Sequence, residues 1–180
     1  MKLRKINAVI SLLCTGLLLN HTAVHAIWML SHGRLPKITT NSYRIVPWVL
    51  VVLMLAHAAI SIVLAVLGHK GSIKGQYNGY AKLNRVTYIQ RFSGIALILF
   101  SALHIAGAAG FMTPPPFIHA ALSAVFFTIA LAHAAISTGK AFITLGIGNA
   151  AFIKAADIVI KIVCAAALIA AITGFCLYRV

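Results

Sequence analysis

Two histidines of this chain lie in identical local sequences. His57 and His133 each occupy the third position of the seven-residue phrase Leu-Ala-His-Ala-Ala-Ile-Ser, and His21 and His104 lie in two further apolar segments. An ionisable side chain at membrane depth is costly and marks a functional site by default. Because imidazole is a common axial ligand of haem iron, these four side chains predict the ligands of two haems.

Apolar helices must position these histidines. The 180 residues are 62% hydrophobic, with a mean hydropathy of +1.01. About 20 apolar residues, rising ~1.5 Å each, cross a hydrocarbon core of ~30 Å as a helix. The sequence therefore predicts one all-α transmembrane domain over residues 1–180, with five helices over about residues 6–30, 45–67, 87–111, 117–139 and 156–178.

The first two spans are repeated in the third and fourth. Beyond the shared phrase, one spacing recurs in two sets of residues: Asn7, Ser11 and His21, and then Gln90, Gly94 and His104. Repeated membrane halves often hold their substrate or cofactor at the interface between them. Since the fifth span has no histidine, we predict a four-helix haem-binding bundle with one peripheral helix.

Depth along the helices suggests how the four ligands pair. His57 and His133 lie roughly 16 to 20 Å from the helix ends on the N-terminal side of the membrane, and we pair them around an inner haem b. His21 and His104 are paired around an outer haem b. His25, one turn from His21 on the same helical face, is the alternative outer ligand, although the repeat favours His21. The alternative for all of them is hydrogen bonding or packing between helices.

Basic residues indicate orientation. The chain has 15 Lys and Arg and a single acid, Asp157, which we expect to pair with Lys161 one turn away. The basic residues gather before the first span and between the second and third, which places the N-terminus in the cytoplasm and the C-terminus outside a bacterial cytoplasmic membrane. This distribution indicates that the basic residues contact membrane lipid and not a nucleic acid. The basic N-terminus also suits a cleavable signal peptide, whose removal would delete His21.

One motif connects the chain with a known family. The segment Gln90-Arg91-Phe92-Ser93-Gly94, followed by His104, resembles the Gln-Arg-x-Ser/Thr-Gly motif and haem ligand of the di-haem cytochrome b anchors of succinate dehydrogenase and quinol:fumarate reductase, the complex II family. The segment Leu18-Leu19-Asn20-His21 is similar to the family's first ligand segment. The resemblance extends over nearly the whole chain. It implies bis-histidine haems, with Gln90, Arg91 and Ser93 contacting the cofactors.

The resemblance also implies partners. In the family, a flavoprotein carrying FAD interconverts succinate and fumarate, and an iron–sulfur subunit connects it with the anchor, which exchanges electrons with a quinone, commonly menaquinone. We expect the basic segment from Lys70 to Arg85 to dock the iron–sulfur subunit on the cytoplasmic side. Arg91 is expected to bind a haem propionate or a quinone carbonyl. Lys140, two turns from His133, is expected to reach an inner-haem propionate.

Two alternatives stay open. The chain could be the cytochrome b anchor of a hydrogenase or formate dehydrogenase, although the Gln-Arg-Phe-Ser-Gly motif argues against this. It could also be a haem-free transporter or assembly protein whose histidines bind a metal ion or carry protons. The first alternative predicts different co-purifying subunits, and the second predicts no haem absorbance.

Overall fold

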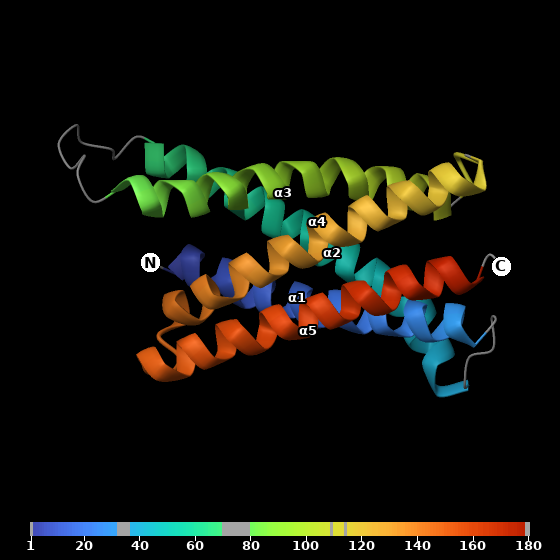
Figure 1. Cartoon of the computed structure of the whole chain (residues 1–180). Coiled ribbons are helices and arrows are strands. Elements are labelled where there is room, and N and C mark those ends of the chain that lie inside the picture. The colour runs from blue at the N-terminus through green and yellow to red at the C-terminus, as the bar shows by residue number, and fades with distance from the viewer. Residues whose placement is uncertain (1, 32–36, 70–79, 109, 114, 179–180) are drawn as a thin grey trace.

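Five long α-helices form a bundle (Figure 1). The computed structural model describes residues 2–31, 37–69, 80–108, 110–113 and 115–178. The helices are α1 Lys2–Leu30, α2 Lys37–His69, α3 Tyr80–Ala108, α4 Pro116–Leu145 and α5 Ala150–Tyr178. The two chain ends lie at opposite ends of the bundle in Figure 1, as five crossings require.

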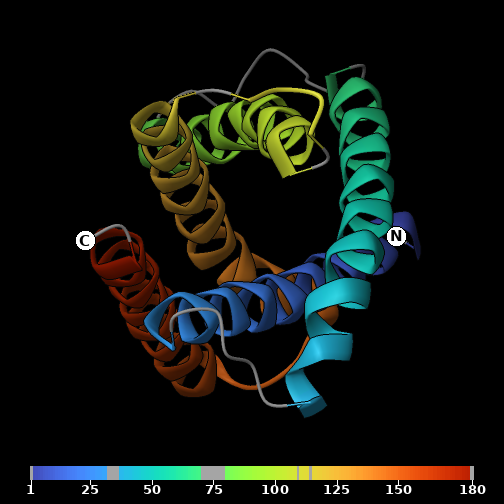
Figure 2. The same cartoon turned by 90° about the vertical axis from the view of Figure 1, so that its right-hand side faces the viewer.

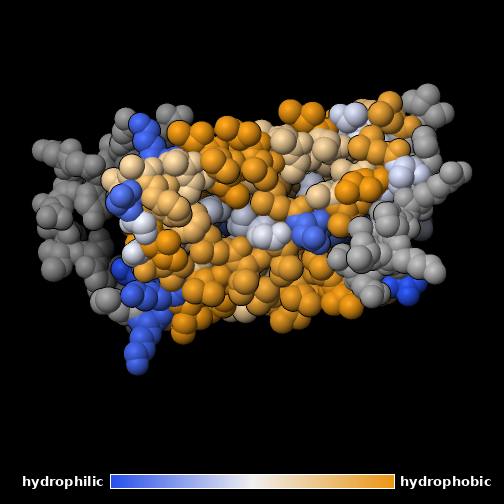
Figure 3. Space-filling view, turned by 90° about the horizontal axis from the view of Figure 1, so that it is seen from below, coloured by the Kyte–Doolittle hydropathy of each residue, from blue (hydrophilic) through white to orange (hydrophobic). Residues whose placement is uncertain are grey.

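All five helices are long and apolar enough to cross a membrane. This finding confirms the prediction of an all-helical chain with five candidate spans. Large apolar side chains such as Val52, Phe92 and Ile95 are exposed on the bundle, as side chains that face lipid are. The face seen in Figure 3 is mostly apolar, and hydrophilic side chains gather at the end where α1 begins.

Some helix ends differ from the predicted spans. Helix α3 ends at Ala108, and α4 continues to Leu145, so that Lys140 lies within α4. Gly146 caps α4 in the left-handed conformation, with φ 73°, and donates its N–H to the Ile143 carbonyl. Helix α5 already begins at Ala150, where the side chain of Asn149 accepts the N–H of Phe152. Capping groups therefore set these two ends, whereas the apolar run by itself suggested a longer connection.

Helix α1 is at the centre of the packing. It packs against α2, α4 and α5, and α4 also packs against α3 and α5. Seen from the end, α1 to α4 surround an interior, and α5 lies outside against α1 and α4 (Figure 2). Gly174 on α5 lets α1 approach closely, because a Cβ there would lie 3.2 Å from the Cβ of Met29. Small residues at a contact allow such close packing of membrane helices.

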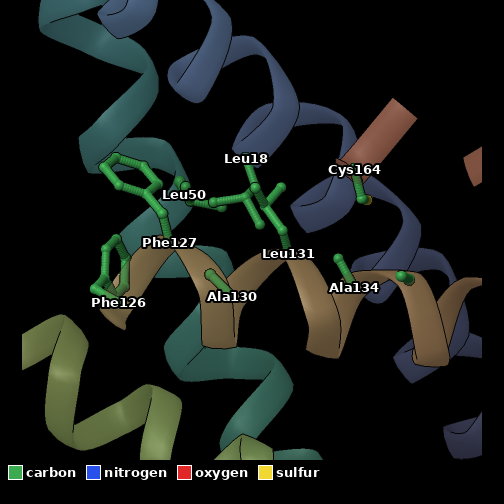
Figure 4. Close-up of a cluster of buried hydrophobic side chains, with 9 residues drawn as sticks. Leu18, Leu50, Phe126, Phe127, Ala130, Leu131, Ala134 and Cys164 are labelled. Carbon is green, nitrogen blue, oxygen red and sulfur yellow. The ribbon is translucent and has the colours of Figure 1, made fainter. Parts of the chain in front are cut away.

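The buried core lies where α4 meets α1 and α2. Phe127 and Leu131 are almost fully buried, and Ala130 and Ala134 leave room beside them for Leu18 of α1 (Figure 4). This cluster fixes the face that α4 turns toward the bundle interior.

Two further predictions concern charged residues. The expected ion pair between Asp157 and Lys161 is present on the surface of α5, and this confirms the i, i+4 prediction. Of the proposed docking segment from Lys70 to Arg85, residues 70–79 lie outside the described residues.

Candidate functional site

A cavity of about 490 Å³ lies inside the bundle. All of its described lining residues belong to α1, α2, α3 and α4, and both His57 and His133 are among them. Pockets that hold cofactors and drug-sized ligands commonly measure about 300 to 1,000 Å³. The cavity therefore has the size of a small-molecule site, and two of the four histidines predicted to bind haem line it.

The structure brings His57 and His133 together from different helices. Their ring centres lie 6.5 Å apart with an angle of 73° between the ring planes. A metal–nitrogen bond of about 2.0 Å to each imidazole would place two axial rings with centres roughly 6 to 6.5 Å apart. The spacing of this pair therefore suits one metal ion held between the two rings.

Ser93 and Gly94 of the Gln-Arg-Phe-Ser-Gly motif contact the His133 ring. The Ser93 hydroxyl lies 2.9 Å from His133 Nδ1 and donates a hydrogen bond of 3.1 Å to the backbone carbonyl of Gln90. A Cβ on Gly94 would lie 3.4 Å from His133 Cε1. The motif thus supplies both a polar contact and the space in which the ring lies.

The sequence repeat reappears as a pair of equivalent hydrogen bonds. Asn7 Nδ2 of α1 donates to the Ser61 hydroxyl of α2 over 3.1 Å. Gln90 Nε2 of α3 donates to the Ser137 hydroxyl of α4, also over 3.1 Å. The two amides occupy matching positions of the repeat, and both serines end the seven-residue phrase. These bonds were not predicted, although the shared spacing of the two halves contained the signal.

The two halves differ beyond these bonds. Lys140 Nζ donates to Gln90 Oε1 over 2.6 Å, whereas Asn7 Oδ1 is buried and has no hydrogen-bond partner among the described residues. The physical reason is a substitution between the halves: Leu64 stands seven residues after His57, where Lys140 follows His133. Likewise His57 Nδ1, although buried, has no partner within the described part of the chain.

The structure places the two predicted cations at the same end of the site. Arg91 is exposed and lines the cavity. Lys140 is partly buried and bonded to Gln90, so it lies beside the α3–α4 contact. Both side chains could give positive charge to an anionic group at this end of the cavity, which is what the sequence predicts for propionate ligands.

The predicted outer ligands pack against aromatic rings. Within the described residues, His104 stacks on Phe126 with ring centres 4.7 Å apart and meets Phe127 at 6.0 Å. His21 stacks on His25 at 6.2 Å, and His25 in turn meets Phe127 at 6.2 Å. The buried Phe127 therefore contacts both His25 and His104. The preference for His21 over His25 as the outer ligand stays a prediction.

His21 has one further feature. Its Nδ1 is buried and has no hydrogen-bond partner among the residues described. A buried imidazole nitrogen without a partner calls for a ligand, a water molecule or another explanation.

Other groups around the cavity were not predicted. Cys14, Thr15 and Ser11 of α1 line it beside the histidines. Thr15 also approaches Thr138 of α4, with 3.4 Å between the hydroxyl oxygens. Nothing in the sequence indicated that these small polar residues line a cavity, because small and polar residues are common at contacts between membrane helices.

In the described part of the chain, no group of three or more His, Cys, Asp or Glu side chains lies close enough to hold a metal ion. Two imidazoles suffice where the equatorial ligands come from a macrocycle, as in haem. No family model, curated protein or solved structure matches the chain.

Proposed function

We propose that the cavity lined by the four helices α1, α2, α3 and α4 binds a haem b, and that His57 and His133 would hold its iron. The observation that carries the proposal is the facing pair of imidazoles, 6.5 Å apart, in a cavity of about 490 Å³. The donor set fits the group, since neutral imidazole is a common ligand of haem iron. Haem bound there would supply one-electron transfer within the membrane.

The residues of this chain would bind and orient the group. His57 and His133 would hold it from α2 and α4, and the apolar cavity walls would keep water away. Arg91 and Lys140 would pair with propionates at the end of the cavity near the α3–α4 contact. The bond from Lys140 to Gln90 supports this role, because it holds the ammonium beside the site while leaving its other protons available.

A second haem b between His104 and His21, or His25, is the further part of this proposal. His104 stacks on Phe126 through its ring face, whereas an imidazole nitrogen binds a metal through a lone pair in the ring plane. The buried Nδ1 of His21 supports a ligand role on that side. One imidazole from each of four helices also supports two bis-histidine centres.

We further propose that the chain is the membrane anchor of a succinate:quinone oxidoreductase. The support is the Gln-Arg-Phe-Ser-Gly motif with His104 and the contact of its serine and glycine with a paired histidine. In this role the chain passes electrons between a quinone, menaquinone by resemblance, and an iron–sulfur subunit that serves an FAD flavoprotein. The dicarboxylate chemistry then belongs to the flavoprotein. We place the soluble subunits at the cytoplasmic end, where α1 begins.

A difference spectrum with pyridine haemochrome quantitation tests the proposal. The protein is purified from haem-replete cells as wild type, His133→Ala, His104→Ala and Thr128→Ala. Thr128 is a matched control, because among the described residues its hydroxyl bonds only back to the Ala124 carbonyl, on an exposed face of α4. We expect about two haems b in the wild type and control, and loss of a different haem in each histidine variant.

Several outcomes would count against the proposal. No haem in the wild type would reject the cytochrome and favour a transporter or assembly protein. Haem retained in full by His133→Ala would reject the inner pair. Co-purification with hydrogenase or formate dehydrogenase subunits, in place of an iron–sulfur protein and a flavoprotein with covalent FAD, would reject the complex II assignment.

A further inference from the structure

We propose that Ser93 is a positioning residue that fixes the tautomer of His133 and makes it the more firmly held of the two inner ligands. The inference rests on the proposed haem site. It concerns the unequal surroundings of two histidines that the repeat makes equivalent in sequence.

Proton accounting at Ser93 determines the tautomer. A serine hydroxyl has one hydrogen to donate and two lone pairs with which to accept. Ser93 donates that hydrogen to the Gln90 carbonyl over 3.1 Å. At the contact of 2.9 Å with His133 Nδ1, Ser93 therefore accepts, and Nδ1 carries the proton. Neutral His133 then has its lone pair on Nε2, the nitrogen that would ligate the metal.

Gly94 fixes where the ring lies. A Cβ at this position would be 3.4 Å from His133 Cε1 and 3.9 Å from Nδ1, so the ring packs directly over the glycine. The Nδ1 atom of the imidazole is therefore held by a hydrogen bond to Ser93, and the neighbouring Cε1 atom is held by contact with Gly94. Ligating histidines are commonly held in this way through their second nitrogen, which fixes ring orientation and raises ligand basicity.

His57 has no comparable support among the described residues. Its Nδ1 is buried without a hydrogen-bond partner, and Ile10 stands at the repeat position that corresponds to Ser93. The backbone of Asn7 lies near the His57 ring, but no side chain of the described residues bonds to Nδ1 as Ser93 does to His133. We infer that His133 anchors the group and that His57 is the ligand that other molecules displace.

The first test replaces the hydroxyl. Ser93→Ala removes the acceptor, and Ser93→Thr keeps it with one added methyl group. Loss of such a partner typically weakens metal-site affinity by about 10-fold to 100-fold. We expect haem to dissociate at least tenfold more readily from Ser93→Ala, and Ser93→Thr to behave like the wild type. Thr128→Ala deletes a hydroxyl from the same bundle away from the site and controls for lost polarity.

The midpoint potential of the inner haem gives a readout that general destabilisation would not move. A more basic imidazole favours the ferric state, so loss of the bond to Ser93 should raise the potential. A tenfold change in the ferric-to-ferrous preference corresponds to about 59 mV. Equal potentials in Ser93→Ala, Ser93→Thr and wild type would overturn the proposal even if haem content fell.

The ligand asymmetry has its own test. His57→Gly should keep the inner haem in a five-coordinate, high-spin form that added imidazole converts to low spin, whereas His133→Gly should lose it. The reverse pattern, or equal loss, would overturn the asymmetry. If the wild type holds no haem, the proposed function fails, and the tautomer is still tested by ¹⁵N NMR of His133. A proton on Nδ1 in the wild type supports the assignment to Ser93, and a proton on Nε2 refutes it.

Discussion

Replacing the two repeat-equivalent amides should have very different effects on stability. Gln90 takes part in two side-chain bonds, to Ser137 and from Lys140. Asn7 donates one bond to Ser61 and buries an oxygen with no partner in the described residues. We therefore expect Gln90→Met to destabilise the protein strongly and Asn7→Leu to change stability little, because each substitution keeps the side chain near its original size.

The magnitudes follow from these contacts. A hydrogen bond to a charged group contributes about 1.5 to 3 kcal/mol, and a neutral side-chain bond between membrane helices contributes about 0.6 kcal/mol. Gln90→Met should therefore cost roughly 2 to 3.5 kcal/mol. Asn7→Leu loses about 0.6 kcal/mol but removes a buried unpaired oxygen, whose desolvation costs about 1 to 3 kcal/mol. Its net effect should lie near zero or be stabilising.

The assay is unfolding by SDS in bicelles at matched haem content, followed by far-ultraviolet circular dichroism. A difference of at least ~2 kcal/mol between the two variants corresponds to a roughly 30-fold difference in their unfolding constants. In a Lys140→Met background, Gln90→Met should cost only about 0.6 kcal/mol, because the charged bond is already absent. Equal costs for the two single variants, or no coupling between Gln90 and Lys140, would refute the reasoning.

Two further predictions use contacts at α5. Gly174→Ala should destabilise the bundle by about 1 to 3 kcal/mol, because the added Cβ would lie 3.2 Å from Met29. The control is Gly16→Ala, whose added Cβ would meet nothing within 4 Å. This control should be neutral or stabilising in the same SDS titration. Asp157→Asn should cost at most about 1 kcal/mol, since the pair with Lys161 is a largely exposed i, i+4 ion pair. Quinol oxidation by the proposed complex should also be unchanged. Loss of this activity would give Asp157 a role in proton transfer.

The five spans could be predicted from the sequence because they depend on local properties. Apolar runs of sufficient length and the absence of water in the hydrocarbon core require helices, whatever the neighbours are. The ion pair of Asp157 with Lys161 is equally local, since residues four apart on a helix are adjacent. The end of α4 was harder to predict, because Gly146 and not the fading of the apolar run terminates the helix.

The candidate site was only partly visible in the sequence. The shared phrase placed His57 and His133 at similar depths, and the structure brings their rings to one cavity. Depth also suggested that His21 and His104 pair, and this pairing stays a prediction. Depth fixes position along a helix, whereas rotation about the helix axis is decided by how side chains interdigitate with neighbouring helices.

The sequence by itself determined that this chain has five apolar spans, a tandem repeat and histidines at membrane depth, because each of these depends on residue type and spacing alone. Only the tertiary structure decided which groups pair. It brought Ser93 to His133 and Lys140 to Gln90, and it left Asn7 Oδ1 without a partner among the described residues. These contacts join separate helices and need hydrogen-bond geometry within a few tenths of an ångström, so only the packing of the complete bundle could determine them.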